Sequence, residues 1–138
     1  MSEYNIFLAS PTDIPDAHFD PAIGLIEEKF SAAIPHASVT VVRAKDEWDK
    51  SFAQCGDWDA WAKHVATGVD CEYRTPLYNA VVCTAESVGR VTAQIVEQAL
   101  SARRMVALVH GQEISQVVSV ERTDSDNRQS MWRLNTSP

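Results

Sequence analysis

The sequence predicts an α/β protein, in which a mostly parallel sheet of about five strands has helices on both faces in a three-layer sandwich. Short apolar or β-branched runs alternate along the chain with segments whose apolar residues recur at helical spacing. This alternation is typical of parallel strands joined by right-handed crossover helices, and here it predicts a small Rossmann-like fold. Because the chain has 138 residues and shows no repeat or linker, we expect a single domain over residues 1–138.

The N-terminal part supplies two strands with a helix between them. Residues 4–9 (YNIFLA) form an apolar run that predicts a buried strand, and residues 37–44 (ASVTVVRA) are rich in β-branched side chains, which favour a second strand. Asp20 as N-cap and Pro21 at the first helical position predict the start of the helix. Pro35 predicts its end.

The middle of the chain mixes polar and aromatic residues. Residues 45–57 show no apolar period and predict an irregular segment. Asp57 is placed to cap a helix that reaches about Ala66, and Gly68 is placed to end it. Residues 69–77 then predict a connector.

The C-terminal part supplies the remaining strands. Residues 78–84 (YNAVVCT) and 105–110 (MVALVH) predict buried strands, and Ser87 is the expected N-cap of the helix between them. Residues 116–121 (QVVSVE) predict a fifth strand. Residues 130–134 (SMWRL) predict either a short final strand or a packed tail.

Composition argues against several classes of protein. A net charge of −7 and a pI of about 4.9 argue against a nucleic-acid polymer as partner, because such binding needs clustered Lys and Arg. No apolar run approaches the roughly 18–20 residues of a membrane span, and the first residues lack the pattern of a signal peptide, so we expect a cytoplasmic protein without membrane contact. The scattered cysteines and histidines predict neither disulfides nor a metal site, and we expect no cofactor.

Ligands of open α/β sheets bind at the carboxyl ends of the strands, so the loops there hold the candidate site residues. Just before the last helix, Gly89 allows close approach of the backbone, and the helix N-terminus offers free N–H groups. Ser87 adds a hydroxyl and Arg90 a positive charge, which together predict a cradle for a phosphate or carboxylate. The alternative is an ordinary turn in which Ser87 only caps the helix.

Two other loops at this edge carry candidate ligand-binding residues. Ser10 and Thr12 follow the first strand, and Asp13 is placed to bind a ribose hydroxyl. The alternative is a Ser/Pro turn in which Asp13 bonds its own backbone. His110 ends a later strand, where it either contacts a ligand or lies in a turn.

Three tryptophans lie in the middle segment, and an indole can stack on a flat base. Trp58 and Trp61 have the spacing of a helical face and are expected to pack their helix on the sheet. Trp48 belongs to no such stripe and is the candidate for stacking on a ligand. The acidic residues between Asp46 and Glu72 are numerous enough to include a general base or nucleophile, but the sequence does not select one.

Residues 4–13 and 78–111 together resemble the nucleoside 2-deoxyribosyltransferase-like family, within the broader group of Rossmann-like nucleotide-binding domains. The resemblance rests on YNIFLASP at the opening strand and on VTAQIVEQALSARRMVAL in the helix and strand near the end. It implies a small parallel sheet, a site for a nucleoside or nucleotide, and a helix glutamate that attacks the anomeric carbon when the base–sugar bond is transferred or hydrolysed. The stretch FLASPTD also resembles the start of domains at the N-termini of some signalling proteins.

The glutamate that this family uses is missing from its expected position. The family's glycine, threonine and alanine fall on Val91, Thr92 and Ala93. Its glutamate falls on Ile95, or on Gln94 after a shift of one residue, and neither side chain is a carboxylate. Glu86, in the loop before the helix, is the candidate catalytic residue that could reach the same pocket from another direction.

The sequence therefore predicts a protein that binds a nucleoside or nucleotide without glycosidic chemistry, as a sensor or sequestering protein. One alternative is an active N-glycosidase or 2-deoxyribosyltransferase that uses a relocated carboxylate, either Glu86 or an acidic residue within 46–72. A further alternative is a protein-interaction module with a purely structural sheet. Homodimerisation fits all three.

Overall fold

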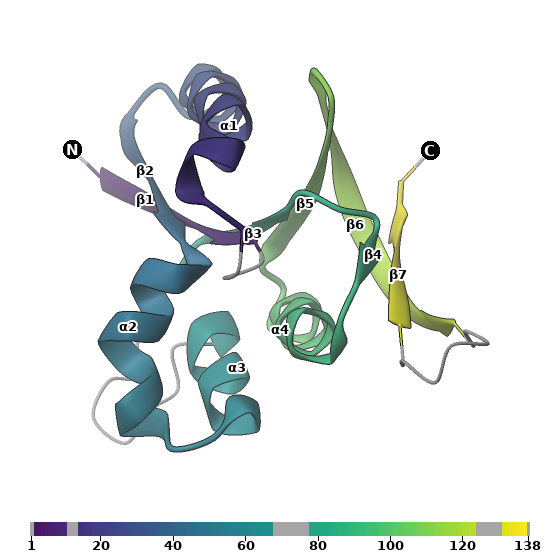
Figure 1. Cartoon of the computed structure of the whole chain (residues 1–138). Coiled ribbons are helices and arrows are strands. Elements are labelled where there is room, and N and C mark those ends of the chain that lie inside the picture. Colours follow the sequence, from purple (N-terminus) through teal and green to yellow (C-terminus); the bar gives the residue numbers. More distant parts are fainter. Residues whose placement is uncertain (1, 11–13, 68–77, 124–130, 138) are drawn as a thin grey trace.

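The computed structural model describes residues 2–10, 14–67, 78–123 and 131–137, which form one seven-stranded sheet and its helices (Figure 1). The elements are, in chain order, β1 (Ser2–Ala9), the 3-10 helix η1 (Asp16–Phe19), α1 (Asp20–Ala33), β2 (Ala37–Arg43), α2 (Ala44–Cys55), α3 (Trp58–Thr67), β3 (Ala80–Cys83), β4 (Ser87–Val88), α4 (Arg90–Ser101), β5 (Met105–His110), β6 (Glu113–Thr123) and β7 (Met131–Thr136). The predicted α/β class is thus confirmed. No helix of the described part is long and apolar enough to cross a membrane.

The sheet is mixed, so the prediction of a mostly parallel sheet of about five strands is wrong. Its strand order is β2-β1-β3-β5-β6-β7-β4. The first four strands pair in parallel, whereas β6, β7 and β4 join by antiparallel pairing. The reversal occurs at Gly111, which has a φ of 55° and lies between His110 and Glu113, two paired residues. A connection this short permits only an antiparallel hairpin, since a parallel return needs a crossover of about a dozen residues.

Two apolar clusters cover the parallel part of the sheet. In β1, Ile6 and Leu8 belong to the cluster that contains α1, whereas Phe7 and Ala9 belong to the cluster that contains α3 and α4. Successive side chains of a strand point to opposite faces, which accounts for this division. The predicted three-layer sandwich with helices on both faces holds only in part, because only α1 and the short η1 join one cluster while α2, α3 and α4 share the other.

The order of the parallel strands creates a switch point between β1 and β3. From β1 the chain passes through α1 to β2 on one side, and from β3 it passes through α4 to β5 on the other side. The connections therefore leave in opposite directions from the carboxyl ends of two adjacent strands. Such a divergence leaves room for a ligand in open α/β sheets.

Helix α2 occupies the segment that was predicted to be irregular, and this prediction is wrong. Its inward face carries Ala44, Glu47, Trp48, Ser51 and Phe52, at the spacing of a helical stripe. Two of these five side chains are polar, so a search for apolar periodicity overlooks the stripe.

The predicted helix starts differ in their accuracy. Asp57 does cap α3, because its Oδ1 accepts a hydrogen bond of 2.7 Å from the backbone N–H of Ala60. Phe19, not Asp20, is the N-cap of α1, and Asp20 instead pairs with Arg43 at 2.5 Å. The expected cap Ser87 lies in β4, opposite Arg133 of β7, so that Gly89 becomes the N-cap of α4.

Two predictions concern residues that the structure does not describe. Gly68 and the connector 69–77 lie outside the described residues. Residues 130–134 were expected to form a strand or a tail, and Met131–Thr136 forms the strand β7.

Candidate functional site

A recess of about 190 Å³ opens at the switch point of the sheet. It is lined by Phe7, Ala9, Ser10, Ala44, Trp58, Trp61, Val91, Thr92 and Ile95. These residues come from the end of β1, the start of α2, the start of α3 and the first turns of α4. Segments far apart in the sequence thus meet where the topology predicts a ligand, and we call this cavity the switch-point recess.

The walls of the switch-point recess are apolar and aromatic, with a few polar groups at defined places. Ser10 and Thr92 contribute hydroxyl groups. At the N-terminus of α4, Gly89 gives no side-chain cap, and the first helical hydrogen bond runs from the N–H of Ala93 to the carbonyl of Gly89. The N–H groups of the first helical turn therefore lack helical acceptors, which favours an anionic or acceptor group of a ligand nearby.

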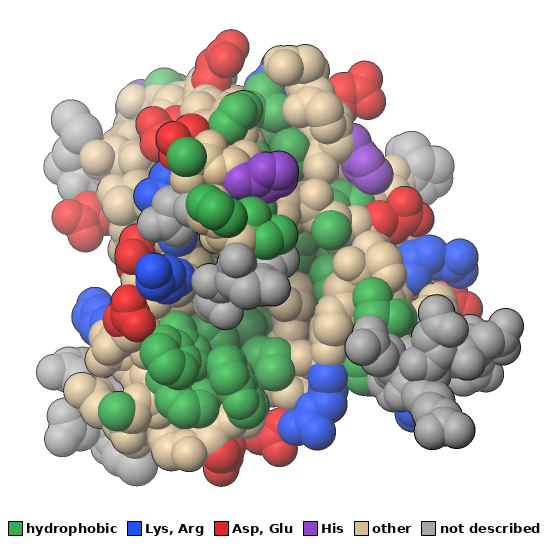
Figure 2. Space-filling model, in the orientation of Figure 1, with side chains coloured by type: hydrophobic (Ala, Val, Ile, Leu, Met, Phe, Trp, Pro, Cys, Tyr) green, Lys and Arg blue, Asp and Glu red, His purple; other side chains and the backbone are tan. Residues whose placement is uncertain are grey.

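An aromatic group continues from the recess across α2 and α3. The ring of Trp48 stacks on Phe52 at 5.2 Å and on Trp58 at 6.3 Å, and Trp58 meets Trp61 edge-on at 5.9 Å. Trp61 is 3% exposed and Trp58 is 43% exposed. Figure 2 shows hydrophobic side chains gathered at the surface in this region.

The argument that singled out Trp48 does not hold. Trp48 lies on the inward stripe of α2 and packs among other rings, although the sequence showed no stripe for it. Of the tryptophans, Trp58 and Trp61 line the recess. Trp61 packs its helix on the sheet as expected, while Trp58 keeps much of its ring accessible.

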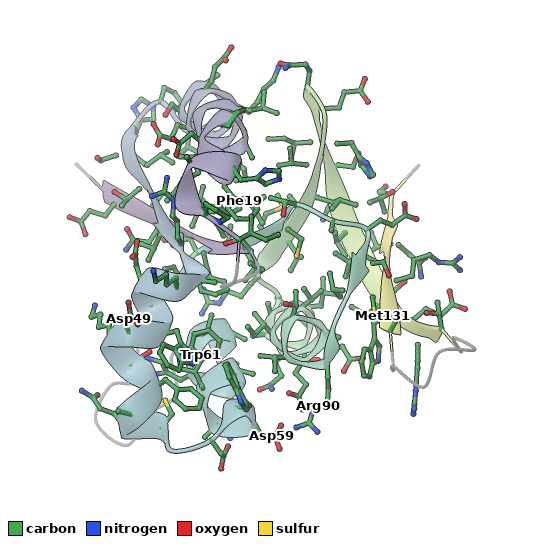
Figure 3. The ribbon with its side chains drawn as sticks, in the orientation of Figure 1. Phe19, Asp49, Asp59, Trp61, Arg90 and Met131 are labelled. Atoms are coloured by element: carbon green, nitrogen blue, oxygen red, sulfur yellow. The ribbon has the colours of Figure 1, made fainter. Side chains whose placement is uncertain are left out.

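Arg90 is held by an acidic partner on α3. Its guanidinium pairs with Asp59 at 2.9 Å, and the side-chain amide of Gln94 donates to the same carboxylate oxygen at 2.8 Å (Figure 3). The hydrogen bond from Gln94, followed by the charge and hydrogen bond of Arg90, lowers the pKa of Asp59. Arg90 therefore links α3 to α4 and lines a neighbouring recess rather than the switch-point recess.

Glu86 and His110 both line a third recess, of about 400 Å³. Its further lining includes Arg133, Asn135 and Thr136 of β7. The backbone carbonyl of Glu86 accepts a hydrogen bond from Leu134, and the side chain of Glu86 is exposed. The structure thus brings Glu86 together with His110 and separates both from Ser10.

The remaining predicted residues are placed as follows. Ser10 lines the switch-point recess, and Gly89 and Ser87 flank the start of α4. Thr12 and Asp13 lie outside the described residues. The described residues contain no group of three or more His, Cys, Asp or Glu side chains that could hold a metal ion.

Sequence reasoning missed one buried acidic group. Glu47 is 2% exposed, and the hydroxyl of Tyr78 donates a hydrogen bond of 2.5 Å to its Oε1. Burial of Tyr78, together with its contact with Glu47, raises the pKa of the phenol far above its ordinary value. The spacing of Glu47 from Ala44 and Ser51 was the available signal for its burial.

No protein-family model matches the chain. No curated protein and no solved structure gives a significant match either. The likeness to nucleoside 2-deoxyribosyltransferases accordingly stays a prediction from the residues quoted above.

Proposed function

We propose that this Rossmann-like chain binds a nucleoside or nucleotide in the switch-point recess and performs no glycosidic chemistry there. The carrying observation is the lining itself, whose described residues combine two indole rings and two hydroxyl groups and include no carboxylate. Indole rings stack on flat bases, and the hydroxyls can fix the orientation of a base or a sugar.

The size of the recess indicates which part of the ligand it holds. A volume of about 190 Å³ lies below the roughly 300–1,000 Å³ of pockets that enclose drug-sized ligands. A flat base therefore occupies the recess, and the sugar or phosphate lies at its mouth. The first turn of α4, which contributes Val91 and Thr92, supplies N–H groups for that part.

The identity of Ile95 favours a binding protein rather than a transferase of the nucleoside 2-deoxyribosyltransferase-like family. This residue stands where the family's glutamate falls, and it lines the same recess. A branched apolar side chain cannot attack an anomeric carbon or support an oxocarbenium ion.

A thermal-shift panel of nucleosides and of nucleoside mono- and diphosphates tests the proposal, with tryptophan fluorescence as a second readout. A ligand at about 100 times its dissociation constant adds roughly 2.7 kcal/mol, which is a shift of several degrees. Thr92→Val and Trp58→Ala should weaken binding, whereas Thr40→Val, on the exposed side of β2, should not. The absence of any shift across the panel would refute the proposal and leave a protein-interaction module.

A second candidate function is N-glycoside hydrolysis or transfer at the third recess. It is favoured by the convergence of a carboxylate, Glu86, and an imidazole, His110, on one polar cavity, because such a pair can divide nucleophilic and acid–base roles. Chromatography for free base distinguishes the candidates. Base release that Glu86→Gln abolishes would establish the enzyme, and intact ligand after long incubation would exclude it.

A further inference from the structure

A buried carboxyl group lies on α2 one helical turn from the wall of the switch-point recess. Glu47 follows Ala44 by three residues on α2, and Ala44 lines the recess. Residues at this spacing share one face of a helix, and both side chains are buried. Glu47 thus continues, one turn further along α2, the face that forms part of the recess wall.

Two sets of contacts tie Glu47 to the wall. The Tyr78 hydroxyl donates to Glu47 Oε1, and the ring of Tyr78 packs 5.4 Å from the ring of Phe7. On the other side, Trp61 Nε1 donates to Ser51 Oγ at 2.9 Å, and the Ser51 hydroxyl donates to the backbone carbonyl of Glu47 at 2.8 Å. Because Phe7 and Trp61 both line the recess, these contacts link the side chain of Glu47 to the wall through Tyr78 and its backbone carbonyl through Ser51.

The second carboxyl oxygen of Glu47 is the unexplained feature. Oε2 is buried, and no described residue donates a hydrogen bond to it. A buried carboxylate oxygen without a donor lowers stability, so most native structures provide a donor. Tyr78 cannot serve both oxygens, because its single O–H is already directed at Oε1.

Building on the nucleoside binding proposed above, we propose that Glu47 anchors the ligand at the back of the recess. Its Oε2 accepts a hydrogen bond from an N–H group of the nucleoside that enters between Phe7, Ala44 and Trp61. Because the base occupies the recess and the sugar lies at its mouth, the donor is an N–H of the base. A carboxylate at this place rejects ligands that offer only an acceptor, since two acceptors repel each other.

Calorimetric titration of the full chain with adenosine, guanosine, cytidine and uridine tests the anchor. Glu47→Gln should bind the accepted nucleoside about 10- to 100-fold more weakly, which is the usual loss for a hydrogen bond to a charged group. Asp49→Asn is the matched control, because it removes the same charge from the exposed side of the same helix (Figure 3). Equal affinity of Glu47→Gln and the wild type would overturn the proposal.

The 2′-deoxy and 3′-deoxy forms of the accepted nucleoside check that the base supplies the donor. Both deoxynucleosides should bind the wild type about as tightly as the parent nucleoside does, and both should lose affinity when Glu47 is replaced. A deoxynucleoside that binds the wild type about as weakly as the parent nucleoside binds Glu47→Gln would contradict the base as the donor.

A stability measurement distinguishes an anchor from a structural group, even if no nucleoside binds. In Glu47→Leu/Tyr78→Phe both polar partners are removed together, so neither is left unsatisfied, and the variant should unfold at or above the wild-type temperature. Binding by the wild type but not by this stable variant supports the anchor. If nothing binds the wild type, the proposed function fails. Separately, if Glu47→Leu/Tyr78→Phe is clearly less stable than the wild type, Glu47 has a structural role and its proposed role in binding is overturned.

Discussion

Helix α4 ends in a turn that requires one residue with left-handed backbone geometry, and the chain places Arg103 there with a φ of 60°. The N–H of Arg104 bonds to the carbonyl of Ala99 at 2.8 Å, and the N–H of Arg103 bonds to the carbonyl of Leu100 at 3.0 Å. This pair of bonds defines a Schellman motif, whose left-handed position is usually glycine.

Replacing Arg103 by glycine should therefore stabilise the protein. The left-handed conformation costs a residue with a Cβ about 1–2 kcal/mol, and the extra backbone freedom of glycine in the unfolded chain costs about 0.5–1 kcal/mol. The difference predicts that Arg103→Gly raises the free energy of unfolding by about 0.5–1 kcal/mol. For a domain of this size the melting temperature then rises by about 2–4 °C.

Urea unfolding of Arg103→Gly and of Ala102→Gly checks the reasoning. Ala102 is the neighbouring C-cap, with a φ of −84°, so glycine there gains nothing from the turn and should lower stability. If Arg103→Gly is destabilised as much as Ala102→Gly, the left-handed turn at the end of α4 does not exist in solution.

The remaining predictions concern the helices beside the recess. The pKa of Asp59 is lowered, chiefly by its hydrogen bond from Gln94, so its contribution to stability is present above the ordinary carboxyl pKa of about 4 and is lost as the pH falls through the lowered value. Urea midpoints measured from pH 5 downwards should thus fall more steeply for the wild type than for Asp59→Asn, and parallel curves would contradict the contact. Trp61→Ala should cost about 3–5 kcal/mol of unfolding free energy, because Trp61 is buried. Trp58→Ala should cost about 1 kcal/mol, since nearly half of Trp58 is exposed, and equal losses would show that α3 is placed differently.

Several elements were predictable because local signals and tertiary packing agree. Residues 4–9 and 105–110 are dense apolar runs that become the buried strands β1 and β5. Asp57 was recognisable as a cap, because a short acidic side chain before a helix satisfies a backbone donor of its first turn. Ser87 carried the same local signal, but pairing of its backbone with β7 placed it in a strand instead.

The candidate site was predictable only as a region. The rule that ligands bind at the carboxyl ends of the strands led to Ser10 and to the start of α4, and both lie at the switch-point recess. The same rule also selected Glu86 and His110, which line a different cavity together with residues of the antiparallel strand β7. Trp58, Trp61 and Glu47 could not be assigned to the site, because their positions depend on how α2 and α3 pack.

By itself, the sequence determined the α/β class and the buried strands, because dense apolar runs must be removed from water wherever the chain places them. The short connection at Gly111 fixes the direction of β6 locally, whereas only the tertiary structure decided that β7 pairs with both β6 and the distant β4. Only the tertiary structure also brought Phe7, Ala44 and Thr92 to one recess. These residues are far apart along the chain, and their meeting is set by the order of the strands, which no local pattern encodes.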